Sequence, residues 1–210
     1  MAAARVADVF SLPERVRAFI GLRLDGAVET AVEALVDRMR TPVDGIRWIP
    51  RANFHLTLFF LGPAVARERL TAIADALGPI AETTAPFEVA AHGVGVFPNP
   101  ARPRVVWVGL DSSGPDGGEL AGLAARVAAA AARCGFEPER RAYSPHLTIG
   151  RVRSLRSPGR LRRSLAEAAD SSFGVSRIER LMLYRSETGP AGSTYHELAA
   201  FALGARENAR

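Results

Sequence analysis

One four-residue pattern, histidine, leucine, threonine and an aliphatic residue, occurs twice in the chain within apolar stretches. The copies are His55-Leu56-Thr57-Leu58 and His146-Leu147-Thr148-Ile149. In a strand, residues two apart point to the same face, so each copy presents an imidazole and a hydroxyl on one face and two aliphatic side chains on the other. The chain must therefore fold so that two strands bury one face in a core and bring the other face to a site.

The duplication decides between a structural and a functional interpretation. A single His-x-Thr in a strand is usually accidental, because threonine favours strands and half-buried histidines are often hydrogen-bonded within the protein. Two copies in the same order, each followed by a nearby glycine, in a chain with four histidines, indicate a function. His92 and His196 lack the repeated context, and we interpret them as structural.

Paired histidines indicate acid–base chemistry. Imidazole changes its charge near neutral pH, so one neutral histidine can accept a proton from water while a protonated partner donates one to a leaving oxygen. Only molecules with one proton on the pair are productive, which predicts a bell-shaped pH dependence around neutrality. The sequence thus predicts that His55 and His146 are catalytic, without a metal ion.

Length, cysteine content and hydropathy limit the class of protein. A chain of 210 residues with 48% hydrophobic residues can bury a sizeable core, which predicts one bilobal domain over residues 1–210. Cys134 is the only cysteine, so no intrachain disulfide can form, and a reducing cytoplasm is expected. Residues 1–10 carry no signal-peptide core, and no stretch approaches the roughly 20 apolar residues that span a bilayer. We expect a cytoplasmic monomer.

The positive charge is concentrated after the second motif. The net charge of +5 comes from arginine alone, because the sequence contains no lysine. Arginine guanidinium groups match phosphate oxygens in pairs, so a basic patch beside a catalytic site would attract a polyanion such as RNA. A solvated basic helix face is the alternative. The clustered residues are Arg151, Arg153, Arg156, Arg160, Arg162 and Arg163.

Hydrophobic periodicity predicts an α+β fold. With one motif strand in each half, we expect two pseudo-symmetric lobes whose antiparallel-rich sheets face a central cleft, with helices on the outside. Gly62-Pro63 is expected to end the first motif strand. The expected strands are Val16–Leu24, Phe54–Leu61, Phe87–Val96, Val105–Leu110, a strand from His146, Gly174–Tyr184 and Thr194–Leu203, and the expected helices are Gly26–Met39, Val65–Leu77, Gly118–Cys134 and Arg160–Ala169.

Further segments around the motifs are distinctive in combination and run through most of the chain. With them the chain resembles the 2H phosphoesterase superfamily, named for its paired His-x-Thr/Ser motifs, and within it the bacterial and archaeal RNA 2′,3′-cyclic phosphodiesterases once described as 2′-5′ RNA ligases. Gly150, where members often have alanine, and the arginine-rich segment after Arg151 depart from the family pattern. The segments are Arg47-Trp48-Ile49-Pro50, Asn53 to Leu58 with Phe60-Leu61-Gly62, Gly95-Val96-Phe97-Pro98, Arg104 to Gly109, Ser144 to Ile149 with Arg151, and Leu183-Tyr184-Arg185-Ser186 with Gly192 and Tyr195.

The resemblance implies hydrolysis of a 2′,3′-cyclic phosphate at an RNA end to a 2′-phosphomonoester, without a cofactor. It implies that His55 donates the proton and that His146 accepts one, although a near-symmetric site leaves this assignment open. In-line phosphoryl transfer suits two imidazoles that face each other. Thr57 and Thr148, about 6.6 Å along their strands from each histidine, are expected to bind the phosphoryl oxygens.

Four further residues are candidates for substrate binding. Arg151 has the strand parity of Leu147 and Ile149, which predicts that its side chain starts on the face opposite His146. Phe97 could stack on a nucleobase or anchor its loop. Tyr195 and Trp48 could each line the cleft or pack in the core.

Other classes of function fit the sequence less well. A metal hydrolase requires three or more convergent ligands, and no HExxH motif or carboxylate cluster accompanies the histidines. A serine hydrolase requires a nucleophile elbow, and no Gly-x-Ser-x-Gly is present. The alternatives that remain are an enzyme of the same superfamily acting on 2′-5′ oligonucleotide linkages or small cyclic nucleotides, and a noncatalytic module that binds RNA ends.

Overall fold

The computed structural model describes residues 9–41, 45–112, 118–138, 141–154, 156–189 and 192–204. Residues 1–8, and residues 190–191 between the last two expected strands, lie outside the described residues. Within these ranges, no helix combines the length and hydropathy needed to cross a membrane.

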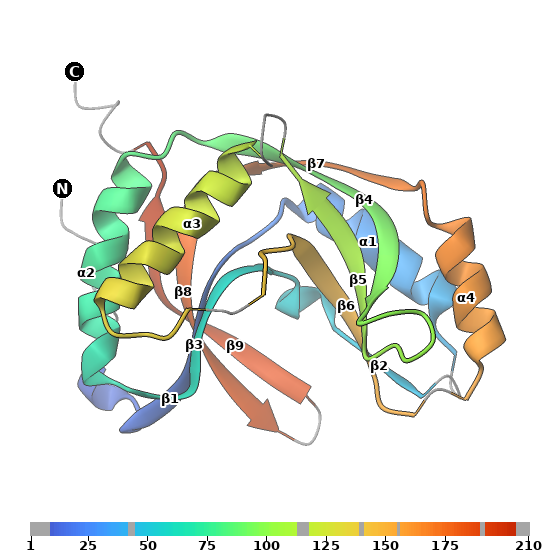
Figure 1. Cartoon of the computed structure of the whole chain (residues 1–210), viewed down its shortest axis with the longest axis horizontal. Helices are drawn as coiled ribbons and strands as arrows, with labels where there is room; N and C mark the ends of the chain where they lie inside the picture. Colours follow the sequence, from blue (N-terminus) through green and yellow to red (C-terminus); the bar gives the residue numbers. More distant parts are fainter. Residues whose placement is uncertain are drawn as a thin grey trace.

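The described strands pair, all antiparallel, in one curved sheet. Their order is β7-β4-β5-β6-β3-β1-β8-β9, and the short β2 pairs with β6 (Figure 1). Their bounds are β1 Arg15–Leu22, β2 Ile46–Trp48, β3 Leu56–Ala66, β4 Phe87–Phe97, β5 Val105–Asp111, β6 His146–Val152, β7 Ser172–Ile178, β8 Arg180–Gly189 and β9 Gly192–Ala202.

The sheet consists of two four-stranded halves related about the junction of β3 with β6. One half is β3-β1-β8-β9 and the other is β6-β5-β4-β7, so each half begins with a motif strand at the junction. The two motif strands meet where Leu56 pairs with Leu147. The expected α+β class with two similar lobes is confirmed, and the strands of the two lobes are joined into one continuous sheet.

Four helices flank the sheet in the described part of the chain. They are α1 Gly26–Met39, α2 Glu68–Glu82, α3 Gly118–Arg133 and α4 Pro158–Glu167. Helices α2 and α3 lie beside the half that contains β8 and β9, whereas α1 and α4 lie beside the other half (Figure 1). Leu56, Leu147 and Ile149 are fully buried among their apolar side chains, so the aliphatic residues of both motifs point into the core as expected.

The first motif strand does not end at Gly62-Pro63. Strand β3 continues to Ala66, and α2 begins at Glu68 rather than near Val65. The register of β3 with β1 shifts at this point, because Ala18 pairs with Gly62 but Val16 pairs with Val65. A proline can occupy a bulge of this kind, because the extra residue of a bulge is not paired in the ladder and its N–H group is not needed for a hydrogen bond.

The expected strand Gly174–Tyr184 is two strands. Strand β7 ends at Ile178 and β8 begins at Arg180, so one residue separates them. Strand β7 pairs with β4 at one edge of the sheet, whereas β8 pairs with β1 in the other half. The chain stays extended as it passes between the halves (Figure 1), and no glycine or proline marks the transition in the sequence.

Candidate active site

The register at the junction brings the two motifs together. Leu56 of β3 and Leu147 of β6 are partners in an antiparallel pair. In such a pair, the residue before one partner lies opposite the residue after the other, so His55 lies opposite Thr148, and Thr57 lies opposite His146. Residues directly opposite each other are about 4.5–5.5 Å apart at Cα, closer than two residues along one strand. The register therefore places the histidine of each motif opposite the threonine of the other motif.

The two imidazoles are held in the same way. The Nδ1 atom of His55 lies 2.8 Å from the carbonyl oxygen of Asn53, and Nδ1 of His146 lies 2.7 Å from the carbonyl oxygen of Ser144. A carbonyl oxygen can only accept a hydrogen bond, so Nδ1 carries a proton in both rings. The Nε2 atom is then the one that gains or loses a proton, and it points away from the chain segment that holds the ring.

Burial disfavours the charged form of both histidines. It lowers the pKa of His55 from 6.5 to about 4, against the effect of the Asn53 hydrogen bond, and the charges of Arg151 and His146 lower it further. Burial and the charge of Arg151 also lower the pKa of His146. The two histidines and Arg151 thus share one electrostatic environment, in which the neutral imidazoles prevail at pH 7.

Arg151 lies on the same face as the histidines, contrary to its parity in the sequence. Val105 and Trp107 of β5 are two residues apart and share a face, but their partners Arg151 and Thr148 are three residues apart. The extra residue is Ile149, which forms a bulge in β6. The bulge turns the exposed side chain of Arg151 to the face that carries Thr148 and His146.

The first motif contains a bulge at the equivalent residue. Phe19 and Gly21 of β1 share a face, but their partners Phe60 and Thr57 are three residues apart, with Leu58 as the extra residue. Phe60, which is 40% exposed, therefore takes the position in the first half that Arg151 takes in the second. The guanidinium of Arg17 lies 4.3 Å from the centre of the Phe60 ring. The two halves thus present different chemistry at matched positions.

Aromatic side chains surround His55. The rings of Phe19 and Tyr195 each lie 4.7 Å from its ring between centroids, and Tyr195 meets it edge to face. Phe19 also stacks on Tyr184 at 5.0 Å. The low dielectric of this aromatic cluster explains why the pKa of His55 is lowered so strongly.

His146 has a smaller aromatic neighbourhood in the other half. Phe97, the last residue of β4, meets its ring edge to face at 5.0 Å, and Trp107 lies 5.2 Å from Phe97. The indole of Trp107 lies over Gly95, where a Cβ atom would clash with the ring. Gly95 is therefore required for the indole to lie beside the site.

The remaining candidates from the sequence fall into two groups, residues that contact the histidines and a residue that does not. Tyr195 and Phe97 contact the two histidines, as lining of the site. Trp48 does not: it pairs with Gly150 and packs with Met39 of α1 and Leu161 of α4 on the helix-covered face. Trp48 is thus a half-buried residue that packs against the core, and it also lines two pockets beside α1.

The carbonyl group that holds His55 is itself fixed from both sides. Asn53 ends a short 3-10 helix, η2 Arg51–Asn53, and its side chain donates a hydrogen bond to the carbonyl oxygen of Ser193 on β9. Arg51 donates hydrogen bonds to the carbonyl oxygen of Gly26 and to Glu29, a buried carboxylate that Arg23 also pairs with. Helix α1 and strand β9 therefore position η2.

Several residues of the site carry only weak signals in the sequence. Phe19, Tyr184 and Trp107 lie in apolar strands that gave no reason to distinguish lining from core. The Nε1 atom of Trp107 is buried without a hydrogen-bond partner. His196 pairs with Glu187 at 3.2 Å, away from this cluster. No group of three or more potential metal ligands occurs among the described residues.

Comparison with known proteins identifies relatives along most of the chain. The family model for the 2′-5′ RNA ligase superfamily matches residues 28–189. A protein from Methanothermobacter thermautotrophicus named RNA 2′,3′-cyclic phosphodiesterase is 33% identical over 90% of this chain and 100% of its own length, and one of the same name from Archaeoglobus fulgidus is 32% identical over 88% and 99%.

Solved structures have the same fold. The crystal structure of Escherichia coli LigT complexed with 3′-AMP is similar with a TM-score of 0.72 and 26% identity, over 90% of this chain and 99% of that one. The crystal structure of a Thermus thermophilus protein, TT0787, gives a TM-score of 0.73 and 27% identity, over 90% and 98%.

The hydrogen bonds and burial of the two imidazoles predict their titration. Because burial lowers both pKa values, we expect each ring to take up its second proton below pH 6.5, with a midpoint of about 4 for His55. ¹⁵N NMR of the free protein should show Nε2 titrating while Nδ1 stays protonated. Spectra of His55→Asn and His146→Asn assign the signals, and a His55 midpoint near 6.5 would contradict the buried site.

Proposed function

Since the chain belongs to the 2′-5′ RNA ligase superfamily, we propose that it hydrolyses the 2′,3′-cyclic phosphate at the end of an RNA chain to a 2′-phosphomonoester. The observation that carries the proposal is the matched pair of imidazoles, each held through Nδ1 by a backbone carbonyl and each beside the threonine of the other motif. This arrangement supplies two proton-transfer groups and two hydroxyl donors about one point.

The reaction uses the two Nε2 atoms on opposite sides of the phosphorus. One neutral imidazole takes a proton from water as the water oxygen attacks phosphorus. The bond between phosphorus and the 3′ oxygen breaks in line, and the other imidazole, protonated at Nε2, gives its proton to that oxygen. The product keeps the phosphate on the 2′ oxygen and has a free 3′ hydroxyl.

We assign the donor role to His55 and the acceptor role to His146, following the family resemblance. Burial lowers the pKa of His55 from 6.5 to about 4, so without a bound anion the ring is protonated only at acidic pH. A bound cyclic phosphate brings a negative charge next to both rings, which raises their pKa values and favours the protonated donor. Substrate binding therefore supplies part of the proton affinity that the buried ring lacks.

The hydroxyls and the guanidinium stabilise the charge that develops on the phosphoryl oxygens. Thr57 and Thr148 lie opposite the histidines of the other motif, where they can donate hydrogen bonds to the two non-bridging oxygens. Arg151 shares their face because of the bulge at Ile149, and its charge acts on both imidazoles. We assign it to phosphate binding rather than to proton transfer.

Aromatic side chains beside each imidazole fit a nucleoside. Phe97 and Tyr195 meet the two histidines edge to face from opposite halves, so either can contact the base or ribose next to the cyclic phosphate. E. coli LigT forms a complex with 3′-AMP, which supports a nucleotide as a ligand of this chain. The single cysteine, Cys134, fits a reducing cytoplasm, and we propose that the enzyme acts there as a monomer.

The first test is hydrolysis of cytidine 2′,3′-cyclic phosphate and of a short RNA that ends in a cyclic phosphate, in the presence of EDTA. We expect a 2′-phosphate as the only product isomer. Because a general acid or base contributes about 10²- to 10⁴-fold, His55→Ala and His146→Ala should each lower kcat by that factor while circular dichroism shows a folded protein. Near-normal turnover by either variant, or turnover only of 2′-5′ linkages, would refute the proposal.

The second test separates phosphate binding from proton transfer. Thr57→Val and Thr148→Val keep the branched side chain and remove the hydroxyl, so each should lower kcat about 10- to 10³-fold, the loss expected for an oxyanion donor. The pH profile should keep its midpoints, because neither hydroxyl titrates. A moved midpoint with little loss of rate would show that the threonines act on the imidazole pKa values instead.

The third test is the pH dependence of the two kinetic constants. In the free enzyme both pKa values lie below 6.5, so the singly protonated pair is lost as pH rises through them. The maximum of kcat/KM should therefore lie on the acid side of 6.5, not at neutrality as the sequence suggested. The kcat profile should lie at higher pH, because the bound phosphate raises both pKa values. A plateau of kcat/KM at alkaline pH would contradict two-histidine catalysis.

A further inference from the structure

A basic groove lies along β2, the short strand that pairs with the second motif strand. It measures about 550 Å³ and is lined by the C-terminal end of α1, by β2 and by the segment that follows β6. Three arginines line it, and Asp37 is the only acidic residue among the described residues of its lining. Its volume lies within the range of nucleotide-sized sites. The charged lining residues are Arg40, Arg47, Arg153 and Asp37.

One of these arginines connects the groove to the catalytic face. Arg47 of β2 is the direct partner of Arg151 of β6 in the antiparallel pair. Opposite residues of an antiparallel pair point to the same side, so the guanidinium groups of both residues start on the face that carries the histidines. The charge of Arg151 acts on both imidazoles, and its partner Arg47 lines the groove, so these two arginines connect the catalytic centre with the groove.

The pairing of Arg47 with Arg151 costs stability unless an anion lies between them. Like charges directly opposite each other in a sheet are destabilising. Among the residues that the structure describes, none forms an ion pair with Arg47, Arg151 or Arg153, and Arg40 reaches Asp37 only at 3.8 Å between exposed side chains. The charge of this surface is therefore available to a ligand.

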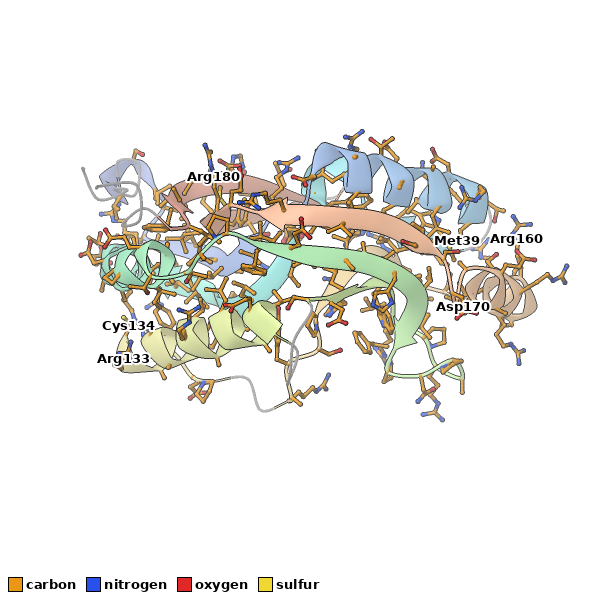
Figure 2. The ribbon with its side chains drawn as sticks, turned by 90° about the horizontal axis from the view of Figure 1, so that it is seen from above. Met39, Arg133, Cys134, Arg160, Asp170 and Arg180 are labelled. Atoms are coloured by element: carbon orange, nitrogen blue, oxygen red, sulfur yellow. The ribbon has the colours of Figure 1, made fainter. Side chains whose placement is uncertain are left out.

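The two halves of the sheet differ in charge at the position of Arg151, and this difference indicates the direction in which an anionic chain would run. In the half that contains β3, the bulge presents Phe60, over which Arg17 lies, instead of a free arginine. Beyond the groove, Arg160 of α4 lines a small neighbouring pocket that shares Ile46 and Trp48 with it. Figure 2 shows Arg160 next to Met39 of α1 at one end of the molecule, whereas Arg133 and Arg180 lie at the other end. The basic surface thus extends from one side of the catalytic centre.

We propose that the groove between α1 and β2 binds the phosphodiester backbone of the nucleotides that precede the cyclic end of a single-stranded RNA. The RNA chain leaves the catalytic centre past Arg151 and Arg47 and continues over Arg40 and Arg153. The proposal rests on the proposed function, and it makes the enzyme selective for RNA oligomers over mononucleotides. Guanidinium groups that bind successive phosphates provide affinity without reading the base sequence.

The test compares an RNA pentamer that ends in a 2′,3′-cyclic phosphate with cytidine 2′,3′-cyclic phosphate. The Arg40→Gln/Arg153→Gln variant should lower the ratio of kcat/KM for the pentamer to that for the mononucleotide about tenfold. Losing two phosphate contacts should also reduce the slope of log affinity against log salt concentration by about 1.4 for single-stranded RNA. Arg133→Gln/Arg180→Gln, which removes the same charge at the other end, should keep the wild-type ratio and slope.

A second variant distinguishes ligand binding from a structural role. Because Arg47 faces Arg151, we expect Arg47→Gln to leave the melting temperature of the free protein unchanged or higher while it weakens binding of the pentamer. Binding is measured by fluorescence anisotropy with a pentamer that ends in a 3′-phosphate, so the groove is tested even if the wild type hydrolyses neither substrate. If the wild type hydrolyses neither substrate, the proposed function is refuted, but the proposal for the groove is not. A wild-type ratio and salt slope in Arg40→Gln/Arg153→Gln, with unchanged anisotropy, would overturn the groove.

Discussion

The pairing of Leu56 with Leu147 is the contact on which the site depends. It joins two four-stranded halves into one sheet, and it lies at the centre of their approximate symmetry. Because both leucines are fully buried, the same contact also fixes the core beneath the catalytic face. Any shift of this register by one residue would turn the motif side chains of one strand to the other face. The core and the active site are therefore held in place by the same few residues.

Paired bulges then make the symmetric sheet into an asymmetric site. Each motif has an extra residue at its fourth position, Leu58 or Ile149, and the residue two positions later turns to the catalytic face. In one half that residue is Phe60, and in the other it is Arg151. The same backbone feature is thus repeated with different chemistry, an apolar aromatic ring on one side of the centre and a guanidinium group on the other.

The sequence predicted the motif strands, the buried aliphatic residues and most element bounds, because these follow from periodicities of two and 3.6 residues. Predictions from the sequence were wrong where the backbone departs from these periodicities. A bulge reverses strand parity, but no particular residue type marks it in the sequence. Arg151 was therefore placed on the wrong face. The transition from β7 to β8 was missed because an extended chain can change partners without a turn residue. Phe19, Tyr184 and Trp107 were missed because an apolar strand residue looks the same whether it faces a core or a site.

The order of the strands has a consequence for how the protein is made. One half, β4 to β7, is nearly continuous in the chain, but the other is built from β1 and β3 and from the last two strands, β8 and β9. The ribosome therefore synthesises both histidine motifs before it adds Tyr184 and Tyr195, which complete the surroundings of His55. Until then the edge of β1 that receives β8 is unpaired. A nascent chain thus carries both histidines before the aromatic surroundings of His55 exist, and these surroundings are complete only once the C-terminal hairpin has joined the sheet.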